Sequence, residues 1–157
     1  LAEKYLKRAL IRPAKDYTVV KDPEPHYYLG LIYRMQGRYK EASDQYWKAT
    51  WYPTFQHPSY LALASMSCLQ NDWIHALELI DRCLEAGGHD TKALTTKAYI
   101  LRKMGRADEA SAVLTQALTV DPLDYWSLSE QSYLKGNNAK FLDESEKQRG
   151  GGLVKIQ

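Results

Sequence analysis

A repeat of 34 residues is the feature of this sequence that most restricts its fold. Residues 23–56, 57–90 and 91–124 align without a gap, and small side chains recur at the same positions of the three segments. A helical hairpin of this length cannot bury its apolar face alone, so consecutive hairpins stack, with small residues where two helices approach closely. The period therefore predicts a stacked array of helix pairs.

Four columns of the alignment carry this pattern. They are column eight (Gly30, Ala64, Ala98), column fifteen (Gly37, Asn71, Gly105), column twenty (Ala42, Ala76, Ala110) and column twenty-seven (Ala49, Cys83, Ala117). Asn71 is the one member that is not small, and Ser67 stands in the same segment where the first segment has an aromatic residue, Tyr33. We therefore expect the second segment to pack differently in detail while keeping the fold.

The pattern resembles the tetratricopeptide repeat family over residues 23–134. In the first segment the residues that match the family are Leu29, Gly30, Tyr33, Gly37, Ala42, Tyr46 and Ala49. In the third they are Ala98, Gly105, Ala110, Leu114, Ala117 and Pro122. The resemblance implies an all-α fold, a right-handed helix-turn-helix solenoid of about 3.5 repeat units.

The same reading divides the chain into segments. We expect a repeat array over residues 1–134 and a charged segment with a glycine-rich tail, truncated in this sequence, over residues 135–157. The array comprises a half repeat (1–16), an insertion (17–22), three repeats (23–56, 57–90, 91–124) and a partial repeat (125–134). Both ends look cut, so we expect this chain to be a fragment of a larger protein.

Helices are expected at eight places in the array. They are residues 1–11, 24–36, 40–52, 57–70, 74–86, 91–104, 108–120 and 124–135, with a further short charged helix at 141–149. Pro13 is expected to end the first helix because proline lacks the amide hydrogen that a helix needs. Ser59, Asp72 and Asp90 are candidate residues for capping helix amino termini.

Composition and motifs argue against several classes of protein. The formal charge of +2 and the absence of a dense Lys/Arg cluster argue against a nucleic-acid partner. No apolar run reaches the length of a membrane span, so we expect no membrane contact and a cytoplasmic location. Cys68 and Cys83 have no CxxC spacing, and the histidines form no ligand pair, so we expect reduced thiols, no metal and no cofactor. Without a phosphate loop or a nucleophile motif, we expect no catalytic residue and no enzyme activity.

The family resemblance implies that function lies on the concave face, which the first helix of each unit lines. The candidate peptide-binding residues on that face are Tyr27, Leu31, Arg34, Ser65, Tyr99, Arg102 and Lys103. Tyrosine and arginine are enriched at binding hot spots, and the cations suit an acidic, aromatic peptide. The alternative is that the aromatic residues belong to the core and the cations form a solvated surface.

The resemblance also argues against one kind of ligand. Some members of the family hold a free carboxyl terminus of a chaperone with a clamp of basic and asparagine side chains. Those columns here contain Tyr27, Leu31, Ala62, Lys92 and Thr96. Only Lys92 conforms, so binding of a chaperone tail is not expected, because carboxylate recognition depends on its donors.

A second resemblance concerns large bacterial proteins linked to carbohydrate utilisation, which carry an amino-terminal domain of unknown function. The strings at residues 48–51 and 121–126 are similar to the repeat region of those proteins. Tryptophan faces can stack on sugar rings, and Trp51, Trp73 and Trp126 are candidates, although Trp73 also occupies a usual inter-helix packing position.

The sequence therefore supports two functions in different classes. The first is a non-catalytic protein interaction scaffold that binds a protein or peptide, or a domain of its own parent chain, on the concave face. The alternative is a helical subdomain of a larger bacterial carbohydrate-processing enzyme. Homo-oligomerisation through the exposed ends of the solenoid is a further alternative, because terminal faces of such arrays are apolar.

Overall fold

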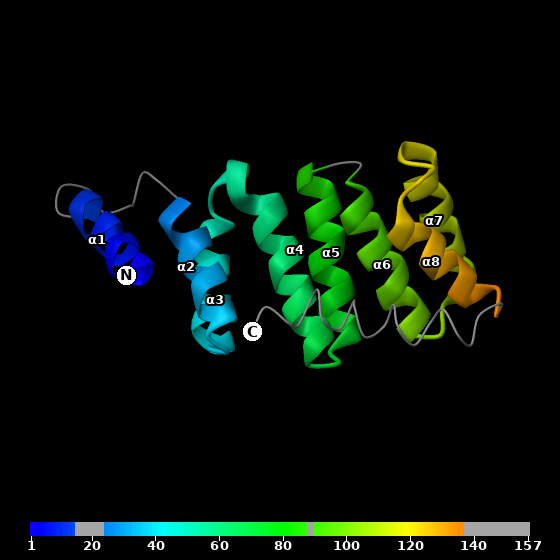
Figure 1. The fold of residues 1–157 in the computed structure, drawn as a ribbon, viewed down its shortest axis with the longest axis horizontal. Coiled ribbons are helices and arrows are strands. Elements are labelled where there is room, and N and C mark those ends of the chain that lie inside the picture. Colours follow the sequence, from blue (N-terminus) through cyan, green and yellow to red (C-terminus); the bar gives the residue numbers. More distant parts are fainter. Residues whose placement is uncertain (15–23, 88–89, 137–157) are drawn as a thin grey trace.

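The computed structural model describes residues 1–14, 24–87 and 90–136, with only the backbone described at 12–14. This part of the chain contains eight helices and follows a single row from α1 to α8 (Figure 1). The helices are α1 (Ala2–Ala14), α2 (Glu24–Met35), α3 (Tyr39–Ala49), α4 (Pro53–Leu69), α5 (Trp73–Gly87), α6 (Thr91–Lys103), α7 (Ala107–Val120) and α8 (Tyr125–Leu134). The predicted all-α architecture of helix pairs is confirmed.

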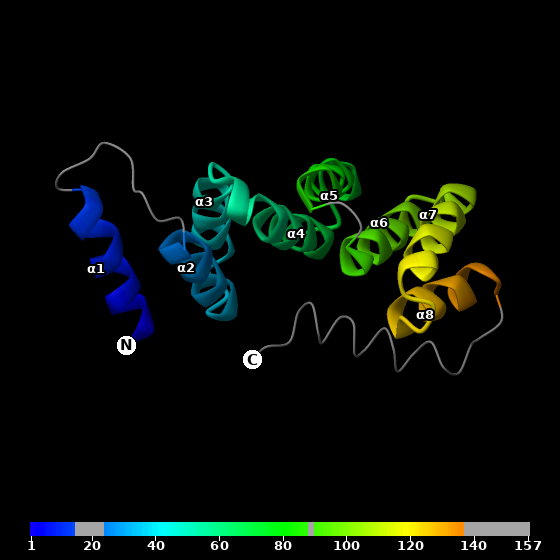
Figure 2. The ribbon, with the colours of Figure 1, turned by 90° about the horizontal axis from the view of Figure 1, so that it is seen from above.

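Successive helices pack in antiparallel pairs along the row. The tightest pairs are α2 with α3, α4 with α5, and α6 with α7. Seen from above, α3, α5 and α7 lie along one side of the row, and α2, α4, α6 and α8 lie along the other (Figure 2). We call the second side the inner face and the first side the outer face.

The start of α4 differs from the prediction. The helix begins at Pro53 instead of residue 57, because Tyr52 is extended and proline suits the first turn of a helix, where its missing amide hydrogen is not needed. As a result Ser59 is fully buried inside α4 and caps nothing, so that prediction was wrong. Asp72 and Asp90 do cap, since their carboxylates accept hydrogen bonds from the backbone N–H groups of His75 and Lys92.

The first helix also differs from the prediction, because α1 continues through Pro13 to Ala14. A proline near the end of a helix removes one hydrogen bond without preventing another residue from joining. Leu6 and Leu10 of α1 pack against the core of the array.

A polar network joins α1 to the residues that follow α2. The carboxylate of Glu3 lies 2.7 Å from Nζ of Lys7 and 3.4 Å from Nη1 of Arg38. Hydrogen bonding to Lys7, with further bonds to Gln36 and Arg38, lowers the pKa of Glu3 to about 2. The Glu3 carboxylate is therefore ionised at neutral pH, and its contacts with Lys7 and Arg38 are ion pairs.

Within each helix pair a small residue faces a large one. A Cβ atom on Gly30 would lie 2.7 Å from the ring of Tyr46, so the absence of a side chain at Gly30 lets that ring pack against the backbone of α2. The residues 34 and 68 positions later are Ala64 with Ile80 and Ala98 with Leu114, and all four are buried. The bulkiest of the three large residues, Tyr46, is thus paired with glycine, which has no Cβ atom.

The turn after the first helix of each unit has the same geometry in all three units. Gly37, Asn71 and Gly105 have φ angles of 74°, 58° and 78°, in the left-handed region. After each, the next backbone N–H bonds to the carbonyl oxygen five residues earlier, as in the Schellman motif that ends helices. Asparagine tolerates this conformation better than other residues with a side chain. The divergence at Asn71 therefore leaves the turn intact.

The buried residues form two apolar clusters that share side chains. The larger extends from α2 to α6, and the smaller lies between α6 and α7. Leu77 and Leu84 of α5 pack against both clusters. The core is thus continuous along the row instead of being gathered at one centre.

Several predictions fall outside the described residues or are not decided by them. The insertion at 17–22 and most of the charged tail, including the expected helix at 141–149, lie outside the described residues. The boundaries proposed for the repeat units stay predictions.

Gly30→Ala should destabilise the protein by about 1–3 kcal/mol because the added methyl group overpacks the contact with Tyr46. In a Tyr46→Leu background the added cost should fall below about 1 kcal/mol, since alanine faces leucine at Ala98 and Leu114. Urea unfolding of the four proteins of this cycle measures the difference. Equal costs in both backgrounds would contradict the proposed contact.

Asn71→Ala should destabilise the protein by about 1 kcal/mol, whereas Asn71→Gly should leave its stability unchanged or slightly raised, because alanine resists the left-handed conformation. Thermal and urea unfolding measure both variants. Equal stability of the two variants would show that the turn does not require this conformation.

Candidate functional site

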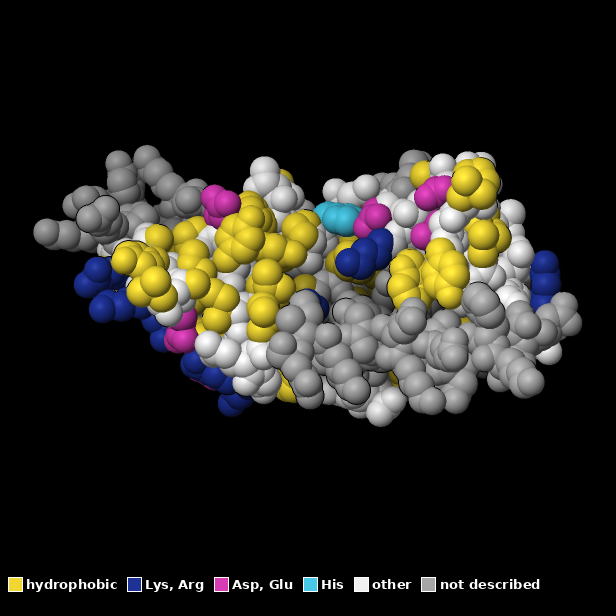
Figure 3. Space-filling model, viewed as in Figure 1, with side chains coloured by type: hydrophobic (Ala, Val, Ile, Leu, Met, Phe, Trp, Pro, Cys, Tyr) yellow, Lys and Arg dark blue, Asp and Glu magenta, His cyan; other side chains and the backbone are white. Residues whose placement is uncertain are grey.

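The candidate site lies on the inner face, to which α2, α4, α6 and α8 contribute. Figure 3 shows this side of the molecule, where hydrophobic side chains gather over α2 and the neighbouring start of α4 and again over the end that contains α8. On α2 itself, Tyr28 and Met35 are 42% and 49% exposed. Exposed apolar side chains that cluster on one face are a common feature of interaction surfaces.

On α2, the predicted residue Tyr27 is partly buried, because it belongs to an aromatic cluster. Its ring centroid lies 5.7 Å from that of Tyr46 and 5.5 Å from that of Phe55 at the start of α4. Burial raises the pKa of Tyr27, and the positive charge of Arg34 acts in the opposite direction. Leu31 and Arg34 are likewise partly exposed. The structure therefore brings three predicted residues together on one helix, with Tyr27 partly in the core.

On α4, the predicted residue Ser65 is buried. Its hydroxyl donates a hydrogen bond to the backbone carbonyl oxygen of Leu61, 2.8 Å away in the preceding turn of the same helix. A serine whose hydroxyl is bonded to its own helix offers little to a ligand.

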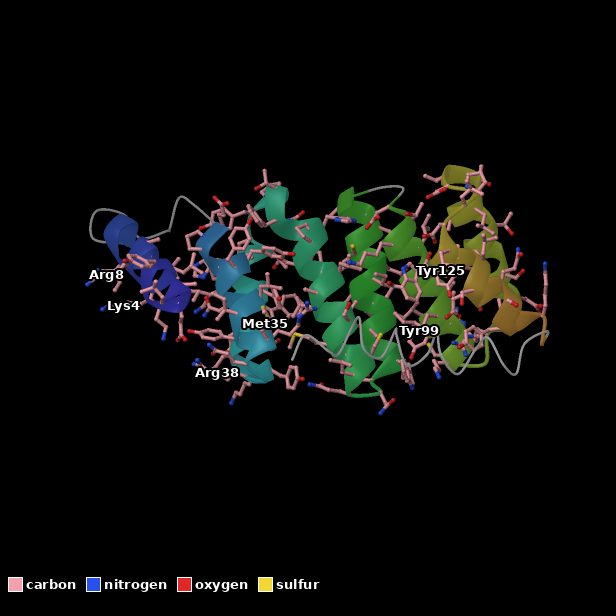
Figure 4. All side chains as sticks on the ribbon, viewed as in Figure 1. Lys4, Arg8, Met35, Arg38, Tyr99 and Tyr125 are labelled. Carbon is pink, nitrogen blue, oxygen red and sulfur yellow. The ribbon has the colours of Figure 1, made fainter. Side chains whose placement is uncertain are left out.

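On α6, the predicted residues Tyr99, Arg102 and Lys103 lie together. The Tyr99 ring packs edge-on against Trp73 of α5, with centroids 6.0 Å apart. The guanidinium of Arg102 and the ammonium of Lys103 lie 5.3 Å and 5.5 Å from the centroid of the same ring. Figure 4 shows Tyr99 on α6 and Met35 on α2, on either side of α4. Apart from buried Ser65 on α4, the predicted residues therefore form two groups, one on α2 and one on α6.

Arg102 has a structural partner that the sequence did not reveal. Its Nε donates to Oε2 of Glu130 in α8 at 2.7 Å, and its Nη2 lies 3.3 Å from Oε1 of the same carboxylate. Arg102 is 18% exposed and Glu130 only 1%, and the ring of Tyr133 lies 4.5 Å from the guanidinium. A buried carboxylate needs such a partner, because its desolvation is costly. Arg102 therefore acts first as the link between α6 and α8.

A second polar contact joins the same two helices at their amino-terminal ends. The hydroxyls of Thr95 and Ser127 are 2.6 Å apart, and Thr95 also reaches the carboxylate of Asp124 at 3.3 Å. That carboxylate caps α8 by accepting a hydrogen bond from the backbone N–H of Ser127. The packing of α8 on α6 thus relies on buried polar groups at both ends.

The cysteines lie in surroundings that disfavour the thiolate. Both are free, and burial raises the pKa of Cys68 and of Cys83 to about 12. The thiol of Cys83 is 3.3 Å from the carbonyl oxygen of His57, to which it donates. A thiolate is the nucleophilic and metal-binding form. Among the residues that the structure describes, no group of three potential metal ligands comes together.

The columns of the carboxylate clamp contain one cation in the structure. Ala62 is buried, and the hydroxyl of Thr96 donates to the carbonyl oxygen of Lys92, one turn earlier in α6. Lys92 itself is exposed. This arrangement lacks the converging donors that a terminal carboxylate needs.

Comparison with known proteins gives three findings. Residues 91–122 match the family model of the tetratricopeptide repeat. An uncharacterized lipoprotein of Treponema pallidum is 25% identical over 123 residues, which are 78% of this chain and 63% of that protein. The first tetratricopeptide domain of Spaghetti (RPAP3), solved with the HSP90 peptide SRMEEVD, superposes with a TM-score of 0.63 at 19% identity and covers 73% of this chain and 90% of that one.

The chain spans less than two thirds of the length of the treponemal relative. The likeness to the solved structure, at its low identity, concerns the fold. Of the helices described, none combines the length and apolar character needed to cross a bilayer.

Arg102→Ala should destabilise the protein by about 2–3 kcal/mol, because it leaves the Glu130 carboxylate buried without its partner; partial exposure of Arg102 keeps the loss below that of a fully buried pair. Arg82→Ala, at an exposed position of α5, should change stability by no more than about 0.5 kcal/mol. Urea unfolding measures both variants. Equal small effects would show that the contact between Arg102 and Glu130 contributes little.

Proposed function

We propose that this chain, a tetratricopeptide-repeat protein, is a non-catalytic interaction scaffold that binds a peptide, or a domain of its own parent protein, on its inner face. Tetratricopeptide repeats generally mediate contacts between proteins, and the solved relative holds a peptide. The inner face of this chain combines exposed apolar and aromatic side chains with cations, which supports the proposal.

The observation that carries the proposal is the exposure of large apolar side chains on the inner helices. Tyr28 and Met35 on α2 and Trp126 on α8 are more than one third exposed. Lys92 and Lys103 on α6 are exposed between them along the row. An array that used this face only for its own packing would bury such side chains, whereas a binding face presents them together with charges that orient a ligand.

The proposed ligand is a segment with apolar residues toward α2 and acidic residues toward α6. Aromatic and thioether side chains adapt well to apolar anchors, and the two lysines favour carboxylates. A free carboxyl terminus held by a clamp is not part of this proposal, because only Lys92 among the clamp columns carries a charge. Arg102 contributes to the shape of the face, since its guanidinium already binds Glu130.

Two further parts of the sequence interpretation stay proposals. Trp51 is 75% exposed, which favours the alternative that the array belongs to a carbohydrate-processing enzyme and offers a stacking surface to sugar. That alternative predicts an effect on sugar turnover when the segment is deleted from its parent protein, and no partner for the segment alone. A cytoplasmic location also stays a proposal.

The inner-face proposal predicts a partner that Met35→Ala/Lys92→Ala weakens by tenfold or more, because the variant removes one apolar anchor and one cation. The matched control is Ile74→Ala/Arg82→Ala, which removes an exposed apolar residue and a cation from α5. Each protein is used for affinity capture from native lysate, captured proteins are identified by mass spectrometry, and affinities follow by calorimetry.

A partner lost by the inner-face variant and kept by the control supports the proposal. Identical captures by all three proteins would contradict the assignment of the face. An empty capture by all three would contradict binding by the isolated segment.

A further inference from the structure

A cavity of about 300 Å³ opens on the outer face, away from the inner-face site. It lies between α3 and α5, with α4 beneath it, and Figure 2 shows these two helices on either side of α4. Buried side chains of Leu63, Met66 and Leu79 contribute its apolar lining, and Tyr39 and Trp47 of α3 contribute aromatic groups. The volume is at the lower end of the range for small-molecule sites.

The cavity exists because small polar residues stand where the next unit has large apolar ones. Ser43 and Ser67 line it, and the residues 34 positions later are Leu77 and Leu101. Leu101 is 1% exposed, and Leu77 packs against both core clusters. The space between α3 and α5 is therefore open at positions where leucine side chains fill the equivalent space between α5 and α7.

Ser67 provides an unused hydrogen-bonding group in this cavity. The residue is 7% exposed, yet its hydroxyl has no hydrogen-bond partner among the described residues. Ser65 and Thr95, also in inner helices, donate to the carbonyl oxygen one turn earlier. The Ser67 oxygen is not among the fully buried, unpaired polar atoms of the described residues, so it reaches the cavity and is available to a ligand.

Two opposite charges stand at the mouth of the cavity. Lys40 and Asp44 are one helical turn apart on the same side of α3, and both line the cavity. Within residues 1–14, 24–87 and 90–136, no ion pair joins either charge to another side chain. His75, at the opposite wall, lies 3.7 Å from Glu78 of its own helix.

We propose that this outer cavity binds a small zwitterion with an apolar body, the chemistry of a free aromatic or aliphatic amino acid. The apolar side chain occupies the space between Leu63, Met66 and Leu79, beside Trp47. The ligand's carboxylate faces Lys40, its ammonium faces Asp44, and Ser67 supplies a hydrogen bond. A neutral sugar is the poorer match, because it would leave both charges of Lys40 and Asp44 unused.

The test is calorimetric titration of the protein with L-phenylalanine, followed by NMR to locate the affected residues. N-acetyl-L-phenylalaninamide has the same side chain without either charge, and D-glucose represents a neutral polyol. L-Phenylalanine should bind, and should shift signals from α3, α4 and α5. The uncharged analogue should bind at least tenfold more weakly, as expected for the loss of charge-assisted hydrogen bonds. Absence of L-phenylalanine binding at millimolar concentration, or equal binding of the uncharged analogue, would overturn the proposal.

The sequence of the next repeat unit suggests a variant that fills the cavity. Ser43→Leu/Ser67→Leu introduces the residues found 34 positions later, Leu77 and Leu101. The variant should therefore abolish binding while keeping or raising the melting temperature. Asp44→Asn should weaken binding about tenfold, whereas Asp108→Asn, at an exposed position of α7 away from the cavity, should leave it unchanged. Binding that survives the double leucine variant would place the ligand elsewhere and contradict the site.

Discussion

Close approach of two helices within each unit is the contact on which the rest of this structure depends. Because Gly30 has no side chain, the ring of Tyr46 can pack against the backbone of α2. In the two later units, alanine takes the place of Gly30, and isoleucine or leucine, both smaller than tyrosine, takes the place of Tyr46. Core packing tolerates little change in volume, so the sizes of the two residues in each pair change together from unit to unit. The matched pairs bring the helices of each unit together, and the faces they leave outward are then available for stacking and for binding.

The contacts that join neighbouring units differ between the middle of the row and its two ends. In the middle, Leu77 and Leu84 belong to both apolar clusters. At the two ends polar contacts are added to the apolar ones, namely the solvent-accessible Glu3 network at α1 and the buried contacts of Arg102 with Glu130 and of Thr95 with Ser127 at α8. Buried polar contacts fix geometry strongly but add less stability than apolar packing. The α8 end therefore depends on specific buried pairings, α1 adds only solvent-accessible ion pairs to its apolar contacts, and the centre depends on continuous burial.

The sequence predicted the architecture because small residues recur with a fixed period, and the helices of the described residues follow the predicted order. It misplaced the start of α4, since the alignment frame suggested residue 57 while Pro53 and extended Tyr52 supplied the actual start signal. For the candidate site, the sequence identified the helix face but not the pairing of Arg102, because Glu130 is 28 residues away and its burial depends on how α8 packs. The same limit applies to Ser65, whose hydroxyl bonds to its own helix. The outer cavity likewise becomes visible only when Ser43 and Ser67 are compared with Leu77 and Leu101 in space.

Native-state hydrogen exchange, read residue by residue, tests the central claim that paired helices form the stable units and that apolar contacts join them at the centre. The account predicts the slowest exchange in α4, α5 and α6, which the shared leucines connect, and earlier opening of α1 and α8, which polar contacts hold. Arg102→Ala should accelerate exchange in α8 while leaving α4 and α5 protected. Equal protection of all eight helices, or protection of α1 as high as that of α5, would contradict the account.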